Sequence, residues 1–216
     1  MNKNKNTSTA DRTFQLNKTD FLPVLIFAAI FFMTWLFMHG VNHFLALTPE
    51  ALGKYYDFKW IIIAHITAGG GTLIFGIIQF WKKLRTFSWQ LHRIVGFIYL
   101  LAVLVSSTCA LILAFTTTYE VSWAVAFTLQ IWAGVWLSAT IIAYYMVVKK
   151  RFKLHHEWMV RSYIITLGFL ISGFALKIHF IQELGKTEDI QSPLFWMGWS
   201  VPLFIYEIIK SSKTSH

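Results

Sequence analysis

Long apolar runs constrain this chain more than any other feature of its sequence. They lie at about 21–45, 59–81, 92–116, 123–148, 158–182 and 193–210. A helix of roughly 20 mostly apolar residues crosses a hydrocarbon core about 30 Å thick, and it satisfies its backbone hydrogen bonds internally. Only 13% of the residues are charged, too few to cover the surface of a soluble domain. We therefore predict an all-α integral membrane protein with six transmembrane helices.

The distribution of charge along the chain predicts its orientation. Fifteen of the 19 Lys and Arg residues lie in or next to the two tails and the segments after the second and fourth runs. Acidic residues such as Glu50, Asp57 and Glu120 lie in the other segments. Because cytoplasmic loops carry the excess of Lys and Arg, both termini are predicted to face the cytoplasm. The basic residues form no continuous face, so nucleic acid is not an expected partner.

The predicted organisation is one membrane domain between two short tails. Residues 1–20 are rich in Asn, Lys, Ser and Thr, and we expect a disordered cytoplasmic tail there. The six-helix membrane domain covers 21–210, and a second cytoplasmic tail covers 211–216. Cys109 is the only cysteine, which excludes an intramolecular disulfide and a multi-thiolate metal site. Pro202 is expected to kink the last helix.

Seven of the eight histidines lie in or beside the predicted spans and separate into two layers. The layer near the outer face contains His39, His43, His65 and His179. The layer near the inner face contains His92, His155 and His156. An imidazole inside a bilayer is costly, so each is a candidate functional group. Haem ligation requires histidines from facing helices at matching depth. Two pairs meet this requirement, His92 with His156 and His65 with His179.

Other observations bear on these two layers. His39 and His43 are four residues apart, which places both rings on one face of a helix, as in helical metal sites. His156 and His179 are 23 residues apart, or about 35 Å along a helix, so one layer of haem or metal is favoured over two. A histidine in a span also serves simply to hydrogen-bond a neighbouring helix. Both interpretations remain open from the sequence.

Arginines and small residues accompany the histidines. Arg93 and Arg161 are candidate partners for haem propionates, an anionic substrate, Glu207 or lipid phosphate, and lipid phosphate is the default. Stripes of small or polar residues follow the second, third and fourth helices: His65, Gly69, Thr72 and Gly76; His92, Gly96 and Tyr99; Gln130, Gly134 and Ser138. Such stripes allow close helix packing and, less commonly, leave room for a flat macrocycle.

Short motifs lie within about residues 60–210. They are His65 followed by Gly69 and by Gly76-x-x-Gln79; His92-Arg93 followed by Gly96 and Tyr99; His156-x-Trp158-Met159-x-Arg161-Ser162-Tyr163; and Trp199-x-x-Pro202 with Glu207. Together they resemble a bacterial family of predicted membrane proteins known as domain of unknown function 2306. The resemblance leaves out the first span, and Lys177 stands where the family usually has an arginine. It implies a four-helix core (helices 2–5) similar to a b-type cytochrome or a ferric reductase, in a bacterial inner membrane. It singles out His65, His92 and His156.

The candidate sites follow from these arguments. Candidate cofactor-binding residues are His65, His92, His156, His179, Arg93 and Arg161. Candidate metal ligands are His39, His43, His65 and His179. The first hypothesis is a redox protein that binds haem b, copper or another transition metal and passes electrons between a quinone or a partner and a second acceptor.

Two other classes of function compete with this one. The first is a non-catalytic assembly or accessory subunit of a respiratory complex, or a metal-delivery factor. The second is a small transporter in which Glu207, Lys177 and the histidines relay protons. A homo-oligomer fits any of the three. The chain has no Walker motif and no extramembrane domain, so it is not expected to drive transport with ATP.

Overall fold

A computed structural model of the chain describes residues 21–81 and 86–214, and all regular structure in these two ranges is helical. The long helices are α1 (Phe21–Val41), α3 (Lys59–Phe80), α5 (Trp89–Leu113), α6 (Trp123–Val148), α7 (Phe152–Ala175) and α9 (Thr187–Thr214). Short helical turns connect them: η2 (Asn42–Ala46), α2 (Pro49–Leu52), η3 (Gly53–Phe58), the π-helical η4 (Ala114–Thr118) and α8 (His179–Gln182). The predicted tail at 1–20 lies outside the described residues.

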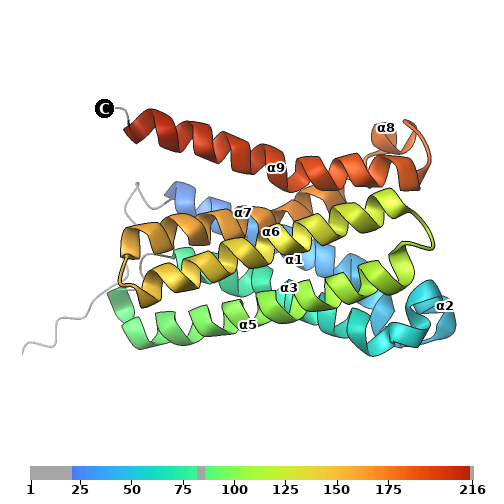
Figure 1. Ribbon diagram of the computed structural model, residues 1–216, viewed down its shortest axis with the longest axis horizontal. Coiled ribbons are helices and arrows are strands. Elements are labelled where there is room, and N and C mark those ends of the chain that lie inside the picture. The colour runs from blue at the N-terminus through green and yellow to red at the C-terminus, as the bar shows by residue number, and fades with distance from the viewer. Residues whose placement is uncertain (1–20, 82–85, 215–216) are drawn as a thin grey trace, which may run out of the picture.

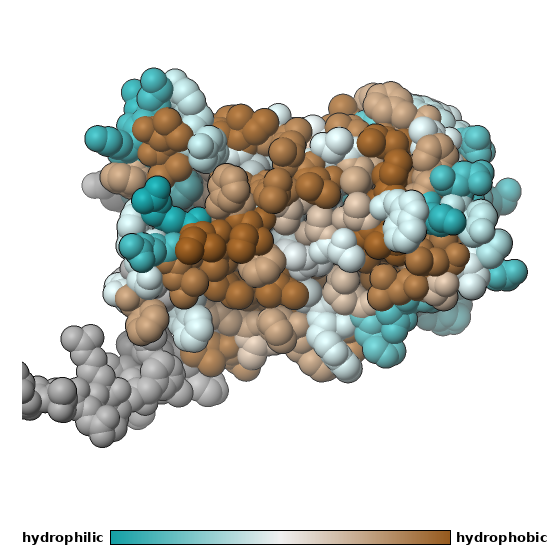
Figure 2. Space-filling view, turned by 90° about the horizontal axis from the view of Figure 1, so that it is seen from below, coloured by the Kyte–Doolittle hydropathy of each residue, from teal (hydrophilic) through white to brown (hydrophobic). Residues whose placement is uncertain are grey.

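Five helical stretches of the described chain are long and apolar enough to cross a membrane, and they confirm five of the six predicted spans. They are Val24–Ala46, Pro49–Phe80, Trp89–Thr118, Trp123–Val148 and Phe152–Ala175. The long helices run side by side along the longest axis of the molecule (Figure 1). Hydrophobic residues cover most of the middle of the face seen in Figure 2, and hydrophilic residues gather at its two ends. This distribution is what a bilayer requires of its proteins.

Helix α9 differs from the sixth predicted span. It begins at Thr187 and ends at Thr214, whereas the sequence predicted a span at 193–210. It is not one of the five stretches named above, because charged and other polar residues such as Glu207 and Lys210 interrupt its apolar residues. The helix continues through Pro193 and Pro202. Residues 211–214 of the predicted tail are therefore helical.

The boundaries of α7 correct a second prediction. The fifth span was predicted at 158–182, but α7 begins at Phe152 and ends at Ala175. It begins early because the α6–α7 turn is short: Lys150 adopts a left-handed backbone conformation with φ 58°, and the helix starts directly after Arg151. The charged residues of the first turns of α7 are thus helical as well.

Aromatic and small polar side chains of α5, α6 and α7 fill the centre of the bundle. Tyr99 and Trp136 are fully buried. The Trp136 indole donates a hydrogen bond to Thr166 Oγ1 at 2.9 Å. Tyr163 of α7 donates to the carbonyl of Leu73 on α3 at 3.0 Å. Interhelical hydrogen bonds of this kind fix the helix register in a membrane, where apolar packing alone drives association weakly.

Helix α9 packs against α7 through two glycines. A Cβ atom on Gly198 would lie 2.0 Å from Ser172 Oγ and 3.0 Å from the Gly168 carbonyl oxygen. A Cβ atom on Gly168 would lie 2.9 Å from the Trp199 Cβ. The two helix backbones therefore approach as closely as they do only because both residues lack side chains.

Candidate functional site

A cavity of about 1190 Å³ lies at the end of the bundle where α3 ends and α5 and α7 begin. We call it the inner cavity, because it lies at the end that the charge distribution predicts to be cytoplasmic. The histidines predicted for the inner layer, His92, His155 and His156, all line it, together with Arg93 and Lys150. Its volume exceeds the roughly 300–1,000 Å³ of most small-molecule sites, so a large ligand fits inside.

Local sequence determines the position of His92. Ser88 precedes α5 and caps it, since its hydroxyl accepts a hydrogen bond from the Leu91 amide at 3.2 Å. His92 therefore lies in the first turn of α5, where its ring stacks on Trp89 with centroids 5.5 Å apart. Gln79 of α3 donates to the His92 carbonyl oxygen at 2.9 Å. The cap and this interhelical bond hold His92 at the wall of the inner cavity.

Consecutive residues of α7 bring the other two rings to the same cavity. The Nδ1 of His155 lies 2.8 Å from the Ala143 carbonyl oxygen on α6. A carbonyl only accepts hydrogen bonds, so Nδ1 carries the proton and, in the neutral ring, Nε2 keeps its lone pair. His156 meets Phe80 of α3 edge to face at a centroid distance of 6.2 Å. The cavity wall thus contains imidazoles from α5 and from α7.

The charge of the inner cavity has one sign. Its basic lining residues are His92, Arg93, Lys150, His155 and His156, and none of the described lining residues is a carboxylate. The rest of the wall is largely aromatic or aliphatic, with Trp81, Trp89 and Tyr144 among its members. A wall of this composition favours an apolar ligand that carries negative charge. The aromatic lining residues are not among those predicted from the sequence, although aromatic residues near helix ends are typical of membrane interfaces.

His65 occupies a different environment on α3. Its Nδ1 lies 2.9 Å from the Ser106 carbonyl oxygen and 3.2 Å from the Ser106 hydroxyl on α5. The ring therefore links α3 to α5 near the predicted outer end. His65 lines neither the inner cavity nor the groove described below. Its environment matches the helix-linking role that the sequence analysis left open.

The other outer histidines do not join His65 in a cluster. His43 lies in η2, beyond the end of α1, so it does not share an α-helical face with His39 as predicted. His179 lies in α8, 86% exposed, with Nε2 3.0 Å from Glu183. The prediction that His179 lies within the fifth span is wrong, because α7 ends at Ala175. Across residues 21–81 and 86–214, no three His, Cys, Asp or Glu residues are grouped to hold a metal ion.

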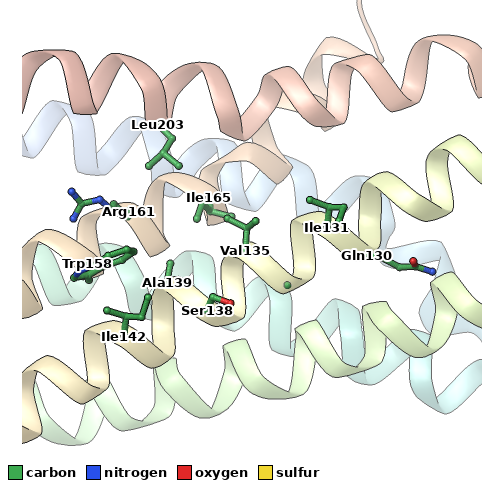
Figure 3. Close-up of a pocket in the computed structure, with 11 residues that line it drawn as sticks. Gln130, Ile131, Val135, Ser138, Ala139, Ile142, Trp158, Arg161, Ile165 and Leu203 are labelled. Atoms are coloured by element: carbon green, nitrogen blue, oxygen red, sulfur yellow. The ribbon is translucent and has the colours of Figure 1, made fainter.

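Arg161 also lies away from the inner cavity. It lines a groove of about 430 Å³ bounded by α6, α7 and Leu203 of α9 (Figure 3). Its guanidinium binds Glu207 of α9 in a bidentate pair, Nε to Oε1 at 2.6 Å and Nη2 to Oε2 at 3.1 Å. It also lies over the Trp158 ring at 4.7 Å. Arg161 therefore does not line the cavity of the inner histidines with which it was grouped. Of its four candidate partners, the structure pairs it with Glu207 and not with the lipid phosphate taken as the default.

Lys177 follows the end of α7. Its ammonium lies over the Phe174 ring at 5.7 Å. It is also close to the backbone of α1, since a Cβ atom built on Gly40 would lie 3.0 Å from the ammonium nitrogen. Cys109 is partly buried on α5. Neither residue lines the inner cavity or the groove.

Residues of the sequence motifs contact one another across helices. A Cβ atom on Gly76 would lie 2.4 Å from the Tyr163 ring. Gln79 binds the backbone of His92. Arg161 binds Glu207. The motifs thus describe one connected set of contacts, and a family model for predicted membrane proteins (DUF2306) matches residues 62–209.

The chain belongs to the DUF2306 family. The matched range contains His65, His92 and His156, and it leaves out α1 with His39 and His43. No curated protein and no solved structure matches the chain. The DUF2306 match therefore supports a membrane protein and covers the inner cavity, and it assigns no ligand to it.

Proposed function

We propose that the protein binds one haem b in the inner cavity and acts as a membrane redox protein. His92 of α5 and His156 of α7 are the residues that would hold its iron. The observation that carries the proposal is that both rings line the same cavity of about 1190 Å³. Haem proteins of helical bundles hold iron between histidines from two helices.

The composition of the cavity wall fits a haem. Arg93 and Lys150 line the cavity, and cationic side chains pair with the propionates of a haem. Gly96 lines it too, and a Cβ atom there would make an ordinary van der Waals contact with Gln79 at 3.6 Å. His155 hydrogen-bonds a carbonyl through Nδ1, as metal-bound histidines do, which makes it the competing ligand on α7.

A transition metal without a porphyrin is the alternative cofactor. Copper or zinc sites need three or four protein ligands, and the described chain has no group of three. A haem needs only one or two protein ligands, because its porphyrin supplies four nitrogens to the iron. This difference supports haem over a bare metal ion.

The proposal includes the position of the protein in the membrane. We place six transmembrane helices, with α9 as the sixth, in a bacterial inner membrane with both termini in the cytoplasm. The Lys and Arg distribution supports this orientation. The charges of α9 are compatible with a bilayer because they are paired: Glu207 with Arg161, and Lys210 with Glu157 at 2.5 Å. Pairing lowers the cost of an ionisable group in a helix bundle.

An optical spectrum with metal analysis tests the proposal. The protein is purified in detergent from cells supplied with haem precursor, and its iron, copper and zinc contents are measured together with its absorption spectrum. We expect stoichiometric iron and a Soret band that shifts on reduction with dithionite. Pure, monodisperse protein that shows neither, before or after addition of hemin, overturns the proposal.

A further inference from the structure

The groove between α6, α7 and α9 is a second site with a different chemistry. Between the two ends of the groove the lining residues are almost entirely apolar, and they include Val135, Ile142 and Ile165. From Gln130 to Ile142 it follows about 18 Å of α6. Figure 3 shows Arg161 and Trp158 at one end and Gln130 at the other. The shape and lining fit one hydrocarbon chain.

Missing side chains on α6 leave the groove open. A Cβ atom on Gly134 would meet no atom of the described residues within 4 Å, and Gly134 lines the groove. Close helix packing does not explain this glycine, because none of the described helices approaches the position of its missing Cβ atom. The gap is therefore available to a ligand.

The groove has hydrogen-bond donors at both ends. Arg161 uses Nε and Nη2 for Glu207, and a guanidinium has five N–H donors in all. At the other end Gln130 accepts a bond from the Tyr119 hydroxyl at 3.2 Å. Its Nε2 is buried and has no acceptor among the described residues. A ligand that matches these ends carries acceptors, such as carbonyl oxygens.

The charge at the Arg161 end restricts the ligand further. Arg161 already pairs with the Glu207 carboxylate through two hydrogen bonds, so the pair carries no net charge. An anionic phospholipid headgroup would meet this carboxylate as well as the guanidinium, and it would lose its hydration without gaining an unpaired cation. The polar part of the ligand is therefore uncharged. An uncharged head with carbonyl acceptors on a long hydrocarbon chain is the chemistry of an isoprenoid quinone.

We infer that the groove binds an isoprenoid quinone, with its ring beside Arg161 and Trp158 and its chain along Gly134 toward Gln130. The inference concerns binding alone and stands independently of the haem. The inner cavity and the groove lie on different faces of the α6–α7 pair, since Trp158 and Arg161 line the groove whereas His155 and Met159 line the cavity. A quinone there would lie one helix layer away from the inner cavity.

The test measures quinone retained by the purified protein. Membranes are loaded with a decyl-tailed benzoquinone, the protein is purified in quinone-free detergent, and the quinone is extracted and quantified from its absorbance change on reduction. Gly134→Leu fills the groove, and Gly134→Ala is the matched control, because both remove a helical glycine and only leucine blocks the chain. We expect wild type and Gly134→Ala to retain the quinone, and Gly134→Leu to retain at least about tenfold less quinone per protein.

A second variant tests the polar end. Arg161→Gln with Glu207→Gln removes both charges together, so neither is left unpaired, and we expect it to weaken quinone retention as well. Equal retention by wild type and Gly134→Leu overturns the inference. The inference is also overturned if a groove variant loses co-purified phospholipid but keeps its quinone, because that result would assign the groove to ordinary lipid. The Soret band of the same samples reports the haem proposal separately.

Discussion

The Tyr99 hydroxyl on α5 lies 2.7 Å from Ser162 Oγ on α7, and both residues are fully buried. Ser162 Oγ is also 2.7 Å from Thr140 Oγ1 on α6, so one serine connects three helices. Tyr99 follows His92 by seven residues on the same helix face. The contact therefore fixes the register of α5 against α7, and with it the positions of His92 and His156 at the inner cavity.

Replacing Tyr99 with Phe tests this connection. The variant removes the hydroxyl and keeps the ring, so we expect a loss of about 0.6–1.7 kcal/mol in the free energy of unfolding, the range measured for hydrogen bonds between membrane helices. Unfolding in detergent micelles titrated with SDS provides the measurement. Tyr145→Phe is the matched control, because Tyr145 is 53% exposed. Equal effects of the two substitutions would show that the network does not hold the bundle together.

Replacing Gly198 and replacing Gly134 with alanine should change the free energy of unfolding in opposite directions. Gly198→Ala places a methyl group 2.0 Å from Ser172 Oγ and 3.0 Å from a backbone carbonyl, and we expect it to cost about 1–3 kcal/mol as α9 moves away from α7. The added methyl group of Gly134→Ala would meet no described residue within 4 Å, and the substitution should stabilise the helix by about 0.5–1 kcal/mol. Thermal unfolding in detergent compares the two. Destabilisation by Gly134→Ala would contradict the open space beside that residue.

The Arg161–Glu207 pair should behave as a unit. Arg161→Met leaves a carboxylate without its partner, and we expect it to cost about 1.5–3 kcal/mol, reduced by the 43% exposure of Glu207. The double variant Arg161→Met with Glu207→Met should recover part of that loss. A double-mutant cycle of unfolding free energies measures the coupling. Strictly additive effects would show that the pair contributes nothing to the contact between α7 and α9.

The membrane topology can be tested with single cysteines. Cys109→Ser removes the only native thiol, after which Lys149→Cys, Lys186→Cys and Ser212→Cys place single thiols at exposed positions. We expect a membrane-impermeant maleimide to label only Lys186→Cys in intact spheroplasts, because the proposed orientation places the other two positions in the cytoplasm. Labelling of both Lys186→Cys and Ser212→Cys from outside would show that α9 does not cross the membrane.

The sequence predicts the long helices well because each one is a continuous run of apolar residues. The distance of a residue from the end of its run gives its depth in the bundle, and the prediction that His92 and His156 lie at the same level is consistent with their shared cavity. Grouping residues by depth alone ignores the direction in which each side chain leaves its helix. Arg161 follows His156 by five residues, or about 140° around a helix, so helical periodicity already indicates that the two side chains face different ways.

The predicted end of the fifth span is also in error. The apolar residues around Ile178 continue the hydrophobic pattern of α7, so the pattern gives no sign that the helix ends at Ala175. The chain turns there and restarts as α8, which leaves His179 exposed. Contacts between helices, such as the one between Gly168 and Gly198, depend on packing that a single sequence does not specify.

A hemin titration of single-histidine variants tests the central claim most directly. Wild type, His92→Ala, His156→Ala and His155→Ala are purified without haem and titrated with hemin, with His43→Ala as a control far from the cavity. We predict a saturable Soret shift to a low-spin, bis-histidine spectrum in wild type, His43→Ala and His155→Ala, and its loss in His92→Ala and His156→Ala. An unchanged low-spin spectrum in either His92→Ala or His156→Ala would contradict the assignment of that ligand. The absence of saturable binding in folded wild type would contradict the haem site itself.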